Sequence, residues 1–261
     1  MNDVVRLHYR DLYVIIYQWK TSLSRMKGRY KRMIYRKKID VKGCRVKHRN
    51  TEKAPMKQYD LQESTPMYHV LNSDGLGEMQ QKLKKYLSEE KFQHSLGVMY
   101  TAAALAMRYQ TDLEQALIAG LLHDCAKSMP NYKKIELCQK QKIPISKAEQ
   151  ASPFLLHAKL GVLLARKKYH IEDEEILSAI RYHTTGRSEM TLLEKIIYVA
   201  DYIEPWRHKA KNLSTIRTLA FQDIDAVLVV ILKNTLEYLK KSGIVVDDMT
   251  LKAYDYYKQK I

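Results

Sequence analysis

Apolar residues recur at intervals of three and four positions from Met79 to the C-terminus, which is the period of an amphipathic α-helix. The first clear segment begins after Ser88, a residue type that caps helices. Its expected inward positions are Phe92, Leu96, Met99 and Ala103. A long apolar segment over 224–239 stops near Gly243, and 244–246 is a short β-branched exception in a region with few strand signals. The pattern therefore predicts an all-α helical bundle over about residues 79–261.

Capping residues mark where further helices begin. Thr111 and Glu114 have the spacing of a capping box before an apolar segment, and Thr191 and Glu194 repeat that spacing. Pro153 follows a serine and is expected in the first turn of another helix. These signals agree with the helical period and place helix starts at several points along the domain.

The first 75 residues carry 17 basic and 7 acidic side chains, so most of the chain's net charge of +16 lies there. They show no sustained apolar period, and residues 1–78 are predicted to form a basic, disordered or loosely helical N-terminal extension. Two origins are open for it, a translated leader with Met79 as the natural start or a true basic arm. Such an arm could bind nucleic acid, which makes a nucleic-acid- or ribosome-associated binding protein an alternative to an enzyme.

The overall composition excludes several classes of protein. The chain has 261 residues, of which 46% are hydrophobic and 28% charged, as in globular proteins. No apolar run approaches the roughly 18–20 residues needed to cross a bilayer, and no secretory signal is recognised. The three cysteines, Cys44, Cys125 and Cys138, lack the spacing of zinc ligands and are expected to be reduced. These features predict a cytoplasmic protein.

Four of the nine histidines lie on the expected inner faces of separate helices or at helix ends. His183 follows Ile180 by three residues and shares its face, and Asp201 follows Ile197 by four. The polar residues expected at inward positions are His94, His123, Asp124, His157, His183 and Asp201. A buried carboxylate among apolar residues needs a partner or a metal ion.

Each of these residues has a simpler explanation when taken alone. A histidine on an apolar face is usually a hydrogen-bonded core residue, and Asp201 could pair with an arginine such as Arg181. Six such residues within one domain favour a metal centre instead. Nitrogen and oxygen ligands without thiolate suit iron, manganese, cobalt or zinc.

The order of His94, then His123 with Asp124, then Asp201 resembles that of the HD-domain metal phosphohydrolases. Four segments carry a closer likeness: FQHSLGV at 92–98, AGLLHDCAK at 119–127, RYHTTGR at 181–187 and ADYIEP at 200–205. They resemble the YqeK family, which consists of bacterial symmetrical dinucleoside tetraphosphatases, over about residues 79–261. The resemblance implies an HD-domain fold and a hydrolase that cleaves diadenosine tetraphosphate to two ADP through a metal-activated water.

The resemblance also implies a ligand set. The positions that match the family's iron ligands are His94, His123, Asp124 and Asp201. His157 and His183 match further histidines that line the site, where they complete a second metal site bridged by Asp124 or hold a substrate phosphate. One or two iron ions are therefore expected, and manganese, cobalt or zinc are alternative metals.

Substrate contacts follow from the same resemblance. The expected substrate-binding residues are His94, Lys127, His157, His183, Thr184, Arg187 and Arg207, of which Arg187 is added from its place in the loop after His183. Asp124 and Lys127 are the expected catalytic residues, because Asp124 can orient or deprotonate the water and Lys127 can balance developing charge. Lys91 departs from the family, which often has arginine there, and so lacks the bidentate fork for phosphate.

The residues themselves do not show which phosphate bridge breaks. Another HD-type phosphohydrolase, acting on a nucleotide monophosphate or an alarmone, is the alternative within the enzyme class. The expected partner is a small dinucleoside polyphosphate, with no membrane, and with nucleic acid only through the basic arm. Whether the protein forms a homodimer stays open.

Overall fold

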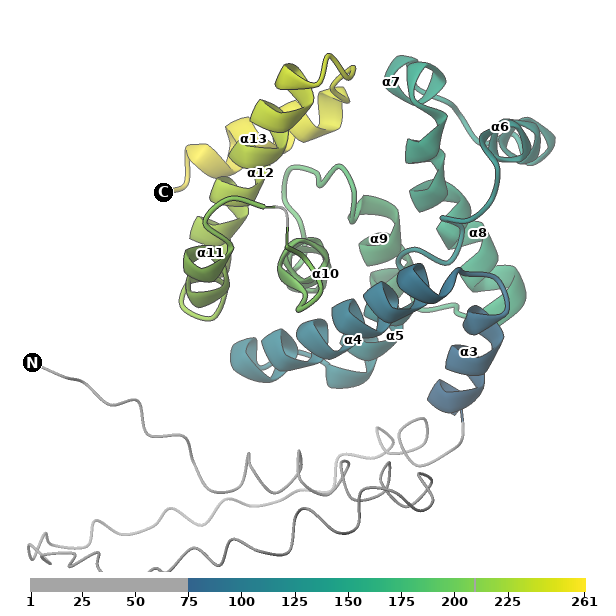
Figure 1. The fold of residues 1–261 in the computed structure, drawn as a ribbon, viewed down its shortest axis with the longest axis horizontal. Helices are drawn as coiled ribbons and strands as arrows, with labels where there is room; N and C mark the ends of the chain where they lie inside the picture. Colours follow the sequence, from purple (N-terminus) through teal and green to yellow (C-terminus); the bar gives the residue numbers. More distant parts are fainter. Residues whose placement is uncertain (1–74, 209) are drawn as a thin grey trace, which may run out of the picture. The chain divides into compact units, whose positions relative to one another are not determined.

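A computed structural model describes residues 75–208 and 210–261, and every regular element in these residues is a helix (Figure 1). The all-α prediction is confirmed. The elements are α3 (Gly75–Lys84), α4 (Glu89–Tyr109), α5 (Leu113–Leu122), α6 (Asn131–Lys140), α7 (Lys147–Ala151), η1 (Pro153–Leu155), α8 (Leu156–Tyr169), α9 (Glu174–Tyr182), α10 (Leu192–Ile203), α11 (Leu213–Ala220), α12 (Ile224–Lys241) and α13 (Asp248–Lys258). Residues 244–246 form no strand.

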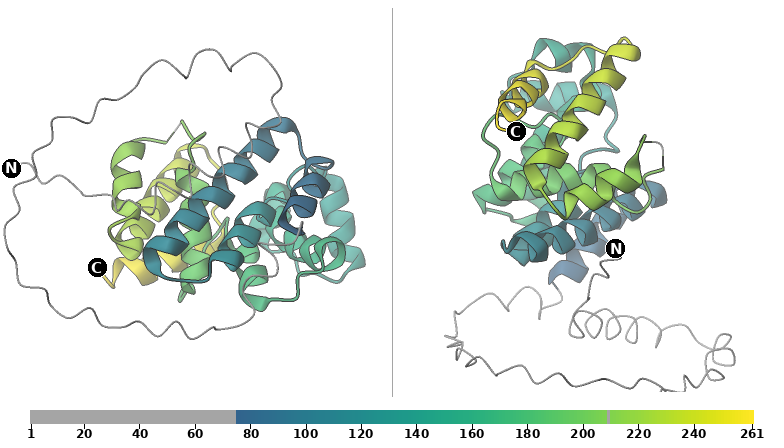
Figure 2. Two further views of the ribbon diagram at one scale, coloured as in Figure 1. Left: turned by 90° about the horizontal axis from the view of Figure 1, so that it is seen from below. Right: turned by 90° about the vertical axis from the view of Figure 1, so that its left-hand side faces the viewer.

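The central helix is α10, which packs against α4, α5, α9, α11 and α12. Figures 1 and 2 show α11, α12 and α13 on one side of it and α6, α7 and α8 on the other. Seven of its twelve residues are apolar and buried, so it is covered on nearly all faces. A smaller apolar cluster under α6 and α8 contains Ala126, Cys138, Leu156 and Leu160. The site described below lies where the ends of several of these helices meet around α10.

The helix starts follow the capping signals with one correction. Thr191 accepts a hydrogen bond from the Glu194 amide and Glu194 accepts one from Thr191, so the predicted capping box is confirmed. The box predicted at Thr111 is wrong by one residue. Asp112 is the N-cap of α5, and its carboxylate accepts from the Gln115 amide at 2.8 Å. Aspartate is at least as good a cap as threonine, and it stands one position closer to the helix.

The other helix ends agree with expectation. Ser88 precedes α4, although its side chain makes no cap hydrogen bond, and Pro153 is in the first turn of η1. α10 ends at Ile203, and α12 ends at Lys241 before Gly243, whose φ is +64°. In α4 the predicted inward residues Phe92, Met99 and Ala103 are buried, while Leu96 is only partly buried.

The predicted basic extension, and with it Cys44, falls almost wholly on residues that the structure does not describe. The described helical region begins at Gly75 in α3, and Met79 lies within that helix. None of the described helices is long and apolar enough to cross a membrane.

The packing of α4 on α5 depends on Gly120. A Cβ atom there would lie 2.8 Å from the Met99 Cα and 3.2 Å from the Val98 carbonyl oxygen, which are backbone atoms that cannot move aside. We expect Gly120→Ala to lower the free energy of unfolding by about 1–3 kcal/mol, measured by urea denaturation. Gly77→Ala is the matched control, because a Cβ there meets nothing within 4 Å. Equal stability of the two variants would contradict this account of the helix contact.

Candidate metal centre

The six inward polar residues of the sequence come together in space. His94 lies in α4, His123 and Asp124 follow α5, and His157 lies in the first turn of α8. His183 follows α9, and Asp201 lies in the last turn of α10. Of these residues His123 is wholly buried and Asp124 is 4% exposed, whereas His94 and Asp201 lie partly open to solvent. The interior of α4 and the ends of four other helices thus bring residues more than 100 positions apart in the chain to one place.

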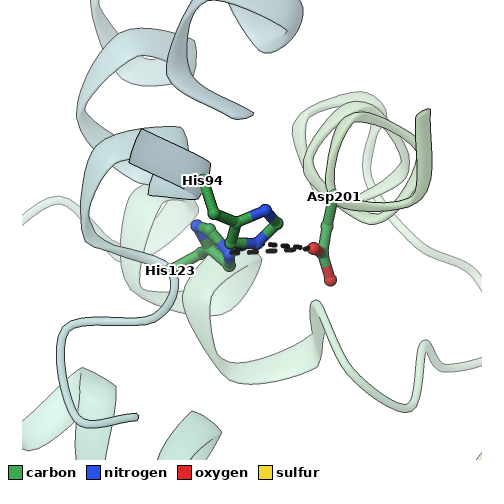
Figure 3. A group of neighbouring side chains, drawn as sticks. All are labelled: His94, His123 and Asp201. Carbon is green, nitrogen blue, oxygen red and sulfur yellow. Dashed lines mark hydrogen bonds and ion pairs between the residues drawn. The ribbon is translucent and has the colours of Figure 1, made fainter. Parts of the chain in front are cut away.

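One group of ligand atoms is formed by His94, His123 and Asp201 (Figure 3). The Nε2 atom of His94 lies 3.0 Å from Asp201 Oδ1 and 3.3 Å from His123 Nε2. His123 Nε2 is 3.9 Å from the same Asp201 oxygen. Ligands bound at about 2.1 Å to one ion stand about 3.0–3.4 Å apart. The separations from His94 Nε2 are therefore those of a coordination shell, and the third separation is wider.

A second group adjoins the first and shares His123. It also contains Asp124 and His183, and His157 is a third histidine beside the Asp124 carboxylate. Asp124 Oδ2 is 3.5 Å from His123 Nε2, while its Oδ1 is 3.1 Å from His157 Nε2 and 3.4 Å from His183 Nε2. Asp124 therefore directs one carboxylate oxygen toward His123 and the other toward His157 and His183.

The tautomers of three histidines are fixed by backbone carbonyls. The Nδ1 atoms of His123, His157 and His183 lie 2.5–2.7 Å from the carbonyl oxygen three residues earlier, so they carry the proton. Their Nε2 atoms then present lone pairs to the centre. Because His157 Nε2 and His183 Nε2 are only 3.1 Å apart, two lone pairs face each other. A cation between such atoms relieves the repulsion.

The Asp124 carboxylate also indicates that a cation binds here. Its Oδ1 atom is buried, yet no hydrogen bond of acceptable geometry reaches it, although Lys127 and two imidazoles stand within 3.1–3.4 Å. A buried carboxylate oxygen without a hydrogen bond is costly unless a cation neutralises it. The donor set of imidazole nitrogens and carboxylate oxygens fits iron, manganese, cobalt or zinc.

The protonation states also suit a metal. Burial lowers the pKa of His123 and of His157 to about 4, so both imidazoles are neutral at pH 7. Burial by itself raises the pKa of Asp124, but the neighbouring imidazoles outweigh it and hold this pKa well below the usual range. The pKa of Asp201 is likewise low, because His94 and Arg207 outweigh the effect of burial. Neutral imidazoles and ionised carboxylates are the forms that bind metal.

Three of the predicted substrate-binding residues border the centre. Lys127 Nζ lies 3.1 Å from His157 Nε2 and 3.3 Å from Asp124 Oδ1. The Thr184 hydroxyl is 3.0 Å from His183 Nε2, and Arg207 donates to Asp201 Oδ1 at 2.7 Å. A lysine, a hydroxyl and a guanidinium thus lie beside the ligand atoms, where an anionic group would meet them.

Two open pockets flank the centre, and Arg207 lines both. The larger, of about 640 Å³, also contains His94, Glu204 and the exposed ring of Trp206. The smaller, of about 240 Å³, contains Lys127, His183, Thr184 and Asp201, together with Tyr202 and residues of α12. The α12 contribution, from Ile231 and Thr235, gives no signal in the sequence because it depends on how α12 packs beside α10.

A family model for the HD domain matches residues 92–206. A protein of Bacillus subtilis described as "Bis(5'-nucleosyl)-tetraphosphatase, symmetrical" is 40% identical over 174 residues, which cover 67% of this chain and 92% of that protein. The protein of the same description from Staphylococcus aureus is 35% identical over 176 residues, or 67% of this chain and 90% of that one. This chain belongs to the YqeK family of HD-domain proteins. The predicted family membership is confirmed.

A solved structure agrees with the family assignment. The crystal structure of a predicted HD superfamily hydrolase from Clostridium acetobutylicum, described as involved in NAD metabolism, matches with a TM-score of 0.68 and 40% identity. The match covers 71% of this chain and 97% of that one. The HD-domain fold that the sequence predicts is therefore confirmed over the described helical region.

Arg187 and Asp201 have other partners in the structure than the sequence suggested. The Arg187 guanidinium pairs with the buried Glu194 at 2.9 Å and lies over the Tyr182 ring, and Arg187 lines neither of the two pockets beside the centre. The carboxylate of Asp201 pairs with Arg207 rather than Arg181, because Arg207 lies in the turn just after α10. Lys91 donates to the Ser128 hydroxyl at 3.2 Å.

Sequence reasoning missed the role of Glu204. This residue is 1% exposed, and its carboxylate lies 3.1 Å from His94 Nδ1. The signal was present in the segment ADYIEP, where an acidic residue follows Asp201 by three positions at the end of an apolar helix. Its partner on α4 is 110 residues away, so the contact itself is a product of the fold.

Proposed function

We propose that this protein hydrolyses diadenosine tetraphosphate symmetrically and releases two ADP. The support is its close relation to proteins described as symmetrical tetraphosphatases, together with the convergence of four histidines and two aspartates beside Lys127, Thr184 and Arg207. The observation that carries the proposal is the facing arrangement of imidazole lone pairs around the buried Asp124 carboxylate. Facing lone pairs around a buried carboxylate destabilise a helical domain that binds no metal, whereas in a metal-dependent hydrolase they supply the ligands.

The proposed ligands of the principal ion are His94, His123, Asp124 and Asp201. His157 and His183 either complete a second ion site, with Asp124 as the bridge, or bind a substrate phosphate. Iron is the proposed metal, and manganese, cobalt or zinc would fit the same donors. When bound, such an ion lowers the pKa of a water molecule and neutralises charge on phosphoryl oxygens.

The protein's own residues have separate tasks in this reaction. Asp124 lies where it can accept a proton from the attacking water or orient it toward a central phosphorus. Lys127 and Arg207 offset the negative charge that grows on the transferred and leaving phosphates, and Thr184 donates a hydrogen bond. Arg187 forms an ion pair with Glu194 and thereby anchors the loop that carries Thr184. Its contribution to substrate binding is to position that loop.

The two pockets suit a molecule with a nucleoside at each end. Because Arg207 lines both of them, a polyphosphate chain that passes Arg207 can extend toward the 640 Å³ pocket on one side and the 240 Å³ pocket on the other. The Trp206 ring in the first and the Tyr202 ring in the second can each stack on a base. A central cut between the pockets would leave each half with one nucleoside diphosphate.

Product analysis tests the proposal. The full-length protein, purified without oxygen and analysed for metal, is incubated with diadenosine tetraphosphate, and the products are separated by chromatography. We expect ADP as the sole nucleotide product, with two ADP formed per substrate consumed. A pair of ATP and AMP, or hydrolysis only of a nucleotide monophosphate or an alarmone with release of phosphate or pyrophosphate, would contradict it.

A further inference from the structure

Glu204 occupies an unusual place beside the candidate metal centre. It is the C-cap of α10, and its side chain is almost wholly buried. Its Oε1 atom lies 3.1 Å from His94 Nδ1, and its Oε2 atom accepts the Trp206 amide hydrogen at 2.7 Å. Among the described residues, no lysine or arginine forms an ion pair with this carboxylate. The imidazole of His94 is therefore the ionisable group that its charge faces most closely.

His94 needs such a partner because of its place in the fold. His123 and His183 follow the ends of their helices and His157 lies at the start of one, so each reaches a carbonyl oxygen three residues earlier. His94 lies inside the long helix α4, where the backbone carbonyls already accept helical hydrogen bonds. A partner from another element must therefore fix its ring.

We propose that Glu204 is a positioning residue for the metal centre. It accepts the Nδ1 proton of His94, fixes the tautomer in which Nε2 carries the lone pair, and aims that atom at the ion. The inference rests on the proposed function, because it assigns His94 as a metal ligand. A ligating histidine that donates its other ring N–H to a carboxylate is held in orientation and made a stronger base.

Two arginines hold the backbone at Glu204 in place, which fixes where its side chain starts. Arg217 donates to the carbonyl oxygens of Ile203 and Glu204, both at 2.8 Å, and the Arg207 amide donates to the Glu204 carbonyl at 3.0 Å. Glu204 therefore links the His94 ring to the turn that presents Arg207.

The opposite side of the carboxylate is bounded by Gly97 of α4. A Cβ atom at this position would lie 2.5 Å from Glu204 Oε2. The absence of a side chain at position 97 thus gives the carboxylate room to lie against α4 beside His94. Alanine there would displace the end of the Glu204 side chain without changing its charge.

The test is Glu204→Gln in the full-length protein, with Co²⁺ as the probe. Both oxygens of Glu204 act as acceptors, and glutamine has only one oxygen, so either the Trp206 amide or His94 Nδ1 loses its acceptor. We expect Co²⁺ affinity to fall about 10- to 100-fold, measured by titration of the visible absorption band. We also expect nitrogen-15 spectra of the metal-free variant to show His94 shifting from the Nδ1–H toward the Nε2–H tautomer.

Glu149→Gln is the matched control. Glu149 is also a buried carboxylate, but it caps α7 and pairs with Lys159 away from the centre. We expect this variant to bind Co²⁺ with the parent affinity. Gly97→Ala provides a second test that does not depend on the folding of Glu204→Gln, and it should weaken Co²⁺ binding in the same direction.

Parent-like Co²⁺ affinity in Glu204→Gln and Gly97→Ala, with His94 unchanged in its tautomer, would overturn the role of Glu204. Neither readout uses a nucleotide, so the result is separate from the proposed activity. If the parent protein bound Co²⁺ but released no ADP from the tetraphosphate, the proposed function would fail while the effect of Glu204 on the centre was still measured.

Discussion

Replacement of Asp124 by asparagine is expected to lower kcat for ADP release by about 10³-fold or more. The Asp124 carboxylate has His123 beside one oxygen and His157 and His183 beside the other. Asparagine keeps the shape but removes the charge. Its amide can also donate hydrogen bonds to imidazole lone pairs, which stabilises the metal-free arrangement over the metal-bound one. Initial rates of ADP formation, together with metal content per protein, measure the effect.

Asp112→Asn is the control for this substitution. Asp112 caps α5, the helix that leads into His123, and asparagine is an equally good N-cap. The variant should therefore keep parent stability and activity, and a loss confined to Asp124→Asn would show that position rather than residue type matters. If Asp124→Asn released ADP at the parent rate, the assignment of this carboxylate to the reaction would be wrong.

The local elements of this fold could be predicted because their signals are local. Helical period and capping spacing depend on residues a few positions apart, so the α10 capping box at Thr191 and Glu194 was predictable to the residue. The start of α5 was not. Thr111 and Asp112 are adjacent and both can cap, and only the backbone geometry shows that Asp112 meets the Gln115 amide. A difference of one residue is smaller than the precision with which capping rules place the start of a helix.

The site was predictable in its ligand-type residues and much less so in their partners. The inward placement of His94, His123 and Asp201 follows from helical spacing, and the structure brings these residues together. Which cation meets Asp201 depends on the turn after α10, which brings Arg207 to it. The direction of Arg187 depends on Glu194, whose buried charge attracts the nearest guanidinium. Both outcomes depend on the conformation of a loop next to α10, which helical periodicity does not encode.

Removal of divalent metal is expected to destabilise the protein as well as stop hydrolysis. A ligand that binds only the folded state raises the free energy of unfolding by about 2.7 kcal/mol when its free concentration is 100 times its Kd. The increase is about 4.1 kcal/mol when that concentration is 1,000 times Kd. The facing Nε2 atoms of His157 and His183, and the Asp124 oxygen without a hydrogen bond, are folded-state costs that a cation removes. Chelation should therefore lower the free energy of unfolding by about 3–4 kcal/mol, and return of metal should restore it.

Urea denaturation with and without Mn²⁺ at constant ionic strength measures this difference, and Asp124→Asn separates its causes. If the gain comes from the ion between these ligands, the variant should lose most of the metal-induced stabilisation while its metal-free form is at least as stable as the parent's. If Mn²⁺ only screened the protein's net charge, it would instead stabilise the parent and the variant equally. Equal metal-induced shifts in parent and variant would therefore locate the effect elsewhere on the surface and contradict the assignment of Asp124 as a ligand.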